Sequence, residues 1–187
     1  MRHTATRAIA GSLFAVMLAA LPAGQGYAQE AGDSVFAATT TGPSGLPLPR
    51  FVSLRSGKVN SRIGPGVNYP VDWMYLKAGM PMEIIQEYDN WRRIRDADGA
   101  EGWVNQGLLS GRRTGITAPW QRGKDVQIPV YASASKDAGK VALVDPGVVG
   151  SIKKCDGTWC EMIFAGREGY VVQSQIWGAY PGESVDE

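Results

Sequence analysis

Apolar and polar residues alternate along short segments of this chain, and the spacing predicts β-strands. Val71, Trp73 and Tyr75 are separated by single residues, so they are expected on one face of a strand. The segments 82–88 and 91–95 are joined by Asp89 and Asn90, a two-residue connection that favours a hairpin. No segment after residue 50 shows the 3.6-residue period of an amphipathic helix. The pattern predicts an all-β protein.

The same pattern occurs twice. Trp91 and Trp159 each follow a tight turn and begin a strand, and Glu-Gly-aromatic-Val follows at 101–104 and again at 168–171. A repeat of this length predicts two tandem domains, each a small β-barrel of five or six short strands. The predicted organisation is a signal peptide (1–28), a disordered tether (29–49), a first domain (50–113), a linker (114–124), a second domain (125–182) and an acidic tail (183–187).

The first 28 residues have the features of a secretory signal peptide. Arg2 and Arg7 precede an uncharged apolar stretch, and the small-residue pattern 26–28 predicts cleavage before Gln29. The alternative is a retained membrane anchor, but the apolar stretch is short for a span of about 20 residues. The expected location is therefore the periplasm, with no membrane association after cleavage. The tether, rich in small residues and proline, is expected to be flexible.

Composition limits the chemistry. Removal of Arg2 and Arg7 leaves 17 basic and 18 acidic residues, so no excess of charge points to nucleic acid as a partner. The only histidine, His3, lies in the predicted signal peptide. Ser-His-Asp and Cys-His catalytic arrangements need imidazole, and a zinc site at the two cysteines would need two more ligands. We therefore expect no cofactor, no metal and no catalytic residues.

The two cysteines are expected to form a disulfide. Cys155 and Cys160 occupy opposite positions of the predicted hairpin around Gly157 and Thr158, where Cα atoms lie about 4.5 Å apart. Aligning the copies places Glu87 and Arg92 at the same two positions, which predicts an ion pair there. One copy would then close its hairpin by charge and the other by a covalent bond, which stabilises the fold by about 2 kcal/mol.

The stretch 59–66 contains the pattern Asn-x-Arg-x-Gly-Pro-Gly, and further motifs lie at 69–70, 89–94, 101–104 and 177–183. Together they resemble the bacterial SH3-like domain family, in the tandem form found in secreted proteobacterial proteins. The resemblance covers about residues 51–183 and implies partly open barrels with a binding role, often at the cell wall, and no catalysis. The second copy lacks the Asn-x-Arg-x-Gly-Pro-Gly stretch, so any role of that loop is not carried over to it.

The candidate ligand-binding residues are Tyr69, Trp73, Tyr75, Arg62 and Arg93. The three aromatic residues lie near the Gly-Pro-Gly loop and have no aromatic counterparts in the second copy, so the fold does not require them. An exposed aromatic surface beside Arg62 and Arg93 suits a peptide or sugar. Two alternatives stay open: Trp73 packs against the second domain, and Arg62, with Asn60, only fixes the loop.

These features favour a non-enzymatic exported module that recognises cell-wall peptide or glycan. A periplasmic adaptor that docks a protein partner, such as a cell-wall enzyme, is the second hypothesis. A glycosidase using carboxylates such as Glu83 and Glu101 is the third, but the strand and turn positions of these acids already account for them.

Overall fold

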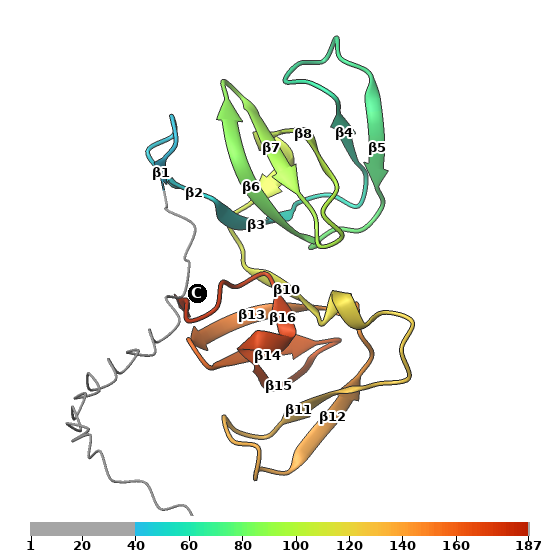
Figure 1. The fold of residues 1–187 in the computed structure, drawn as a ribbon, viewed down its shortest axis with the longest axis vertical. Helices are drawn as coiled ribbons and strands as arrows, with labels where there is room; N and C mark the ends of the chain where they lie inside the picture. The colour runs from blue at the N-terminus through green and yellow to red at the C-terminus, as the bar shows by residue number, and fades with distance from the viewer. Residues whose placement is uncertain (1–39, 187) are drawn as a thin grey trace, which may run out of the picture. The chain divides into compact units, whose positions relative to one another are not determined.

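The computed structural model describes residues 40–186 as an all-β protein, and these residues belong to one compact unit (Figure 1). The predicted signal peptide, the first part of the predicted tether and Glu187 lie outside the described residues. Within 40–186, no helix has the length and apolar character needed to cross a membrane.

The first barrel is an antiparallel seven-stranded sheet with the strand order β5-β4-β8-β7-β6-β3-β9. Its strands are β3 (Arg50–Leu54), β4 (Val59–Arg62), β5 (Val71–Tyr75), β6 (Pro81–Tyr88), β7 (Trp91–Arg95), β8 (Glu101–Asn105) and β9 (Leu109–Ser110). A short 3-10 helix, η1 (Gln106–Leu108), precedes β9. Two alternate residues of β7, Arg92 and Ile94, are buried, and Ile94 lies in the core with Val59, Met82 and Val104.

The second barrel repeats this sheet strand by strand, in the order β12-β11-β15-β14-β13-β10-β16, with β17 paired to β13. Its strands are β10 (Thr114–Thr117), β11 (Ile128–Tyr131), β12 (Lys140–Val144), β13 (Val149–Asp156), β14 (Trp159–Phe164), β15 (Arg167–Val172), β16 (Ile176–Trp177) and β17 (Ser184–Asp186). Two 3-10 helices accompany them, η2 (Pro119–Gln121) and η3 (Gln173–Gln175). The predicted pair of tandem barrels is present.

Three predicted connecting segments differ from the structure. Residues 114–117 of the predicted linker form β10, which is buried between β13 and β16. β10 corresponds to β3, so the second barrel begins there rather than at residue 125. Residues 184–186 of the predicted acidic tail form β17, which pairs with Lys154–Asp156 of β13. The tail thus extends the second sheet.

The end of the predicted tether is also ordered. Residues 40–48 form a hairpin of β1 (Thr40–Thr41) and β2 (Pro47–Leu48). Ser44 in its turn donates hydrogen bonds to both carboxylate oxygens of Glu87, at 2.8 Å from the backbone N–H and 2.7 Å from the hydroxyl. Arg50 donates to the same carboxylate at 2.6 Å. This buried anion holds a segment whose composition alone predicts disorder.

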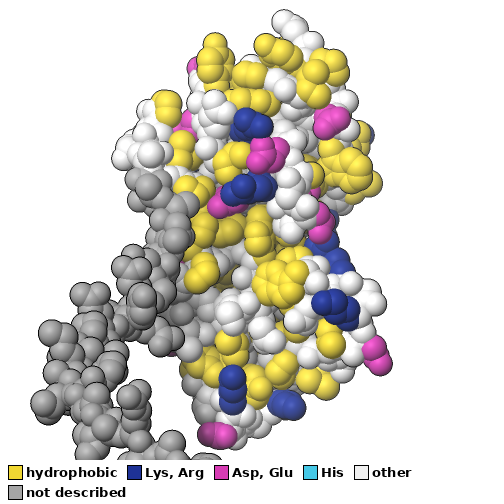
Figure 2. Space-filling model, viewed as in Figure 1, with side chains coloured by type: hydrophobic (Ala, Val, Ile, Leu, Met, Phe, Trp, Pro, Cys, Tyr) yellow, Lys and Arg dark blue, Asp and Glu magenta, His cyan; other side chains and the backbone are white. Residues whose placement is uncertain are grey.

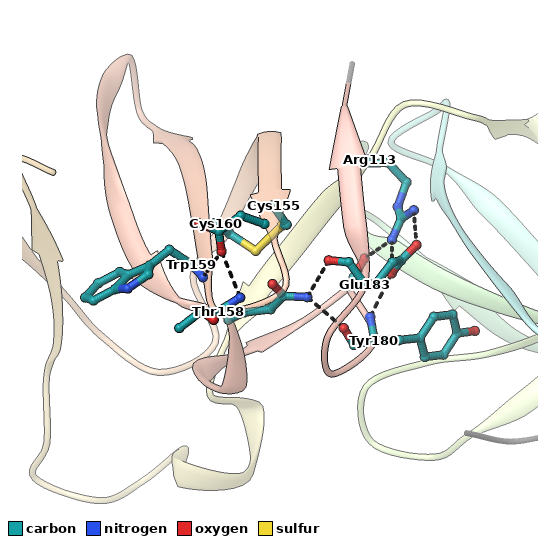
Figure 3. The surroundings of a disulfide bond; sticks show 10 residues. Arg113, Cys155, Thr158, Trp159, Cys160, Tyr180 and Glu183 are labelled. Carbon is teal, nitrogen blue, oxygen red and sulfur yellow. Dashed lines mark hydrogen bonds and ion pairs between the residues drawn. A yellow bond between two sulfur atoms is a disulfide. The ribbon is translucent and has the colours of Figure 1, made fainter. Parts of the chain in front are cut away.

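The equivalent hairpins of the two barrels are closed in the two ways that the sequence predicts. Glu87 lies opposite Arg92, with 3.3 Å between Oε1 and Nε, and both side chains are buried. Cys155 lies opposite Cys160 and the two form a disulfide, with Cα atoms 4.1 Å apart (Figure 3). Both predictions are confirmed.

Phe51 of β3 connects the first barrel to the C-terminal segment of the second. Its ring contacts the ring of Trp177 edge-on, with centroids 5.0 Å apart, and that of Tyr180 at 4.7 Å. The hydroxyl of Tyr180 donates to Glu83 of β6 at 2.9 Å. Arg113 forms an ion pair with Glu183 at 2.8 Å (Figure 3). Its guanidinium also lies over the Phe51 ring, 5.7 Å from the centroid. One aromatic and charged cluster therefore joins the two sheets.

Candidate functional site

An open groove lies on the outer face of the first barrel, with a volume of about 370 Å³. Strands β4, β5, β7 and β8 and the start of the β4–β5 loop line it, through Arg62, Ile63, Asp72, Arg93, Glu101, Gly102 and Trp103. The structure thus brings the two predicted arginines together around one aromatic side chain. In Figure 2, basic and acidic side chains lie next to one another on the side of the first barrel that faces the viewer.

Strand pairing places these side chains. Trp103 of β8 lies opposite Arg62 of β4 on one side and opposite Arg93 of β7 on the other. Directly opposed residues share one face of a sheet, so the two guanidinium groups flank the indole. In β4, Val59 and Ser61 are buried while Asn60 and Arg62 are not, which identifies this face as the outer one.

Gly102 explains the repeated Glu-Gly-aromatic motif. A Cβ at this position would lie 2.1 Å from the Ser61 hydroxyl oxygen, so β8 can cross β4 closely only with glycine there. In the second barrel, a Cβ on Gly169 would lie 2.5 Å from a methyl carbon of Val130. The motif therefore serves the fold, and the glutamate and aromatic residues beside each glycine face outward.

A chain of charged groups leads away from the groove. Arg93 forms an ion pair with Glu101 at 2.8 Å, and Glu101 lies 4.0 Å from Arg95. Arg95 donates two hydrogen bonds to Glu83, at 2.9 and 2.7 Å, and these bonds raise the pKa of Arg95. Glu83 also accepts the hydroxyl of Tyr180. Both acids considered for a glycosidase are thus held by arginines.

The Gly-Pro-Gly loop is fixed by Tyr69 and Arg62. The Tyr69 ring packs over Gly64, where a Cβ would lie 2.4 Å from the ring, and near Gly66, where the distance would be 3.3 Å. Arg62 donates to the backbone carbonyl of Tyr69 at 2.6 Å. The two glycines therefore make room for an aromatic ring. Arg62 has the loop-fixing contact that the sequence suggested, and it also lines the groove.

Trp73 and Tyr75 lie apart from the two arginines. Trp73 is opposite the buried Ser61, and Tyr75 is opposite the buried Val59, so both occupy the inner face of the sheet. Tyr75 is only 5% exposed; burial and a hydrogen bond to Asp96 raise the pKa of its phenol. Trp73 extends beyond the core and is 61% exposed, so most of its surface is left uncovered by residues 40–186. None of the three predicted aromatic residues lines the groove with the two arginines.

A β-bulge brings Asp72 to the groove. Ser61 pairs with Trp73 and the next residue, Arg62, pairs with Val71, so Asp72 is the extra residue of β5. Bulges commonly redirect a side chain. Strict alternation, which places Val71, Trp73 and Tyr75 on one face, fails here, because the bulge sets Val71 opposite Arg62. No hydrogen bond or ion pair joins the Asp72 carboxylate to another residue in 40–186, although Arg62 and Arg93 line the same groove.

The second barrel has no equivalent set of charges. The strand registers match Arg62 with Tyr131, Asp72 with Val141, and Arg93 with Glu161. Tyr131 is buried against Trp159, with ring centroids 5.5 Å apart. Since the same fold forms without the three charged residues, the fold does not require them.

Asp72, Glu101, Gly102, Trp103 and Ile63 line the groove but were not selected from the sequence. Trp103 and Glu101 belong to the repeated Glu-Gly-aromatic motif, and a motif shared by both copies indicates a requirement of the fold rather than a site. Asp72 depends on a bulge that the alternating pattern does not reveal. The absence of a charged residue at position 141 of the second copy is the signal that could have identified it.

The groove offers charge and an aromatic surface, but it contains no metal-binding cluster. Across residues 40–186, no three His, Cys, Asp or Glu side chains are placed to hold a metal ion together. Its arrangement suits recognition of a polar ligand through hydrogen bonds, ion pairs and contact with the indole of Trp103.

Comparison with known proteins identifies the fold. The family model described as bacterial SH3 domain matches residues 55–111 and 124–178. Two solved structures, of NlpC2 and NlpC1 from Trichomonas vaginalis, each share 14% sequence identity with this chain, at TM-scores of 0.30 and 0.29. The alignments cover 69% and 68% of this chain, which spans about half the length of those proteins, 48% and 45%. No curated protein matches the chain.

The family match covers more than half of the chain and corresponds to the two barrels seen in the structure. The resemblance noted in the sequence is confirmed in both copies, including the second, which lacks the loop motif. The chain belongs to the bacterial SH3 domain family, in a tandem arrangement.

Proposed function

We propose that this protein is a non-enzymatic binding module, exported to the periplasm, that recognises cell-wall peptide or glycan. The observation that carries the proposal is the groove of the first barrel, where two arginines, two carboxylates and Trp103 converge. The second barrel has the same fold without Arg62, Asp72 and Arg93. Side chains that the fold does not require, gathered in one concave site, are expected to serve a ligand.

The groove supports binding rather than catalysis. Glu101 is paired with Arg93, and Glu83 with Arg95, so ion pairs within the first barrel already account for both carboxylates. The outer position and open shape suit part of a long polymer, which must reach the site from solvent. Arginine and carboxylate groups can bind both the hydroxyls of a glycan and the charged ends of a peptide.

Co-sedimentation with purified peptidoglycan sacculi tests the proposal. We expect the wild-type protein to pellet and Arg93→Glu, which introduces the residue found at the equivalent site of the second barrel, to bind at least about tenfold more weakly. Arg55→Glu is the matched control, because Arg55 is exposed, lies outside the groove and undergoes the same change of charge. It should bind like the wild type.

Each other outcome is informative. If both variants pellet like the wild type, the protein binds the wall through another surface. If the wild type does not pellet, the wall proposal fails. Export is tested separately, by the N-terminal mass of the protein recovered from the periplasm, which should begin at Gln29.

A protein adaptor is the second candidate, and one feature favours it. Large apolar side chains are exposed on and around the β4–β5 hairpin, where Figure 2 shows hydrophobic side chains gathered. They are Ile63, Val67, Tyr69, Val71, Trp73, Met74 and Leu76. Apolar surface of this kind commonly marks a contact with another protein. A partner recovered through Trp73, without affinity for sacculi, would support this alternative.

A further inference from the structure

We infer that the groove of the first barrel binds a peptide end that carries both a free ammonium group and a free carboxylate. Asp72 accepts hydrogen bonds from the ammonium group, and Arg62 donates hydrogen bonds to the carboxylate. This inference rests on the proposed function and selects peptide over glycan as the ligand. It depends on three observations: an unpaired carboxylate in the groove, a partly free guanidinium beside it, and the loss of both in the second barrel.

Asp72 is the acceptor that the fold leaves available. Of the two carboxylates in the groove, Glu101 is already paired with Arg93 at 2.8 Å. Asp72 has no hydrogen bond or ion pair within 40–186, and a β-bulge sets it in the groove rather than in the regular alternation of β5. An ammonium group has three N–H donors and no acceptor, so a free carboxylate is its natural partner.

Arg62 is the matching donor. One of its terminal nitrogens donates to the Tyr69 carbonyl at 2.6 Å, and this bond fixes the guanidinium at the mouth of the loop. A guanidinium has five N–H groups, so donors remain for a ligand carboxylate. Because its position is set by the loop, Arg62 loses less conformational freedom on binding than an unattached arginine would.

The second barrel shows that the fold forms without the two charged residues assigned to this ligand. Val141 occupies the equivalent bulge position to Asp72, and Tyr131 replaces Arg62. Both members of the charge pair are thus missing from the other copy, while the bulge itself is kept. Neutral sugars need no such pair, whereas a peptide end with a free amine and a free carboxylate does.

The test compares native sacculi with sacculi whose free amines have been acetylated. Acetylation removes the ammonium group and leaves the glycan and the carboxylates in place. We expect wild-type binding to fall by about tenfold, the effect of one lost charge-assisted hydrogen bond. Asp72→Val should bind native sacculi about tenfold more weakly than the wild type and should not respond to acetylation.

Asp125→Val is the matched control, because Asp125 is also exposed but lies outside the groove. It should respond to acetylation like the wild type. Equal binding of the wild type to native and acetylated sacculi would overturn the inference and leave the wall proposal intact. An equal response of Asp72→Val and the wild type to acetylation would also overturn it, because a residue other than Asp72 would then bind the amine. Absence of binding to native sacculi would instead defeat the proposed function, and the inference with it.

Discussion

Glu87 shows how a single buried residue can hold a segment of the chain in an ordered conformation. Burial by itself would raise the pKa of its carboxyl group, but hydrogen bonds from Ser44 and Arg50 outweigh burial and lower the pKa to about 2. Its pairing with Arg92 follows from aligning the two copies of the repeat. Its contact with Ser44 does not, because nothing in a segment of small polar residues shows which buried acid will hold it.

The stability of the protein should therefore depend on acid pH through Glu87. The folded-state pKa lies below the ordinary value of 4.5, so the stabilisation is complete above about pH 4.5 and is lost as the pH falls towards 2. The lowering corresponds to about 3 kcal/mol. Urea unfolding should show the wild type losing about this much of its advantage over Glu87→Gln between about pH 6 and about pH 2. Asp137→Asn, the same kind of change at an exposed position, is the control.

At the scale of strands and hairpins, the sequence predicts those strands whose apolar and polar residues alternate. It does not predict strands that are recognisable only from their pairing with other strands. Strands β3 to β8 and β11 to β15 follow from their spacing and turn residues. The sequence predicts a linker at 114–124, where Pro119, Trp120 and Gly123 lie, but its first four residues, 114–117, form β10. They are buried because β10 lies between β13 and β16, and the Thr117 hydroxyl donates to the Asp145 carbonyl at 2.8 Å.

The same distinction applies to the candidate site. Arg62 and Arg93 were selected from the sequence and do meet in one groove. Trp73 was expected beside them, but its partner across the strand is Ser61, which places it on the inner face. Which residues face one another is set by the strand register, and the register depends on the bulge at Asp72. A shift of one residue in the β4–β5 register therefore determines which side chains of β5 reach the groove.

The two hairpin closures should be interchangeable. Glu87 and Arg92 hold the positions that Cys155 and Cys160 hold in the second barrel, where the Cα atoms are 4.1 Å apart. Glu87→Cys combined with Arg92→Cys should form a second disulfide, detected as an absence of free thiols under denaturing conditions. Since Ser44 would lose its acceptor, residues 40–48 should become sensitive to protease. Protection equal to that of the wild type would show that the Glu87 carboxylate does not hold this hairpin.

At the scale of the whole molecule, the cluster around Phe51 predicts that the two barrels unfold together. Phe51 is 8% exposed and contacts Trp177 and Tyr180, so it belongs to the first sheet but packs against residues of the second. Phe51→Ala should cost about 3 kcal/mol of unfolding free energy. Calorimetry should show one transition for the wild type and two for the variant. A variant that still unfolds in one transition would show that other contacts couple the barrels.

The two copies have the same fold but different outer faces, and this difference underlies the proposed function. The first barrel has Arg62, Asp72 and Arg93 around Trp103. At the matching positions near Tyr170, the second barrel has the buried Tyr131 together with Val141 and Glu161. A ligand that is bound through charged groups should therefore have different affinities for the two barrels.

The most direct test is a titration of the isotope-labelled protein with soluble peptide fragments of the cell wall, followed by NMR. The account predicts chemical-shift changes at the indole N–H of Trp103 and at the backbone of Arg62, Asp72 and Arg93. The matched positions Tyr131, Val141 and Glu161 should remain unchanged. Changes confined to the second barrel, or none at fragment concentrations well above those of the protein, would contradict the claim that the first barrel binds the wall through this groove.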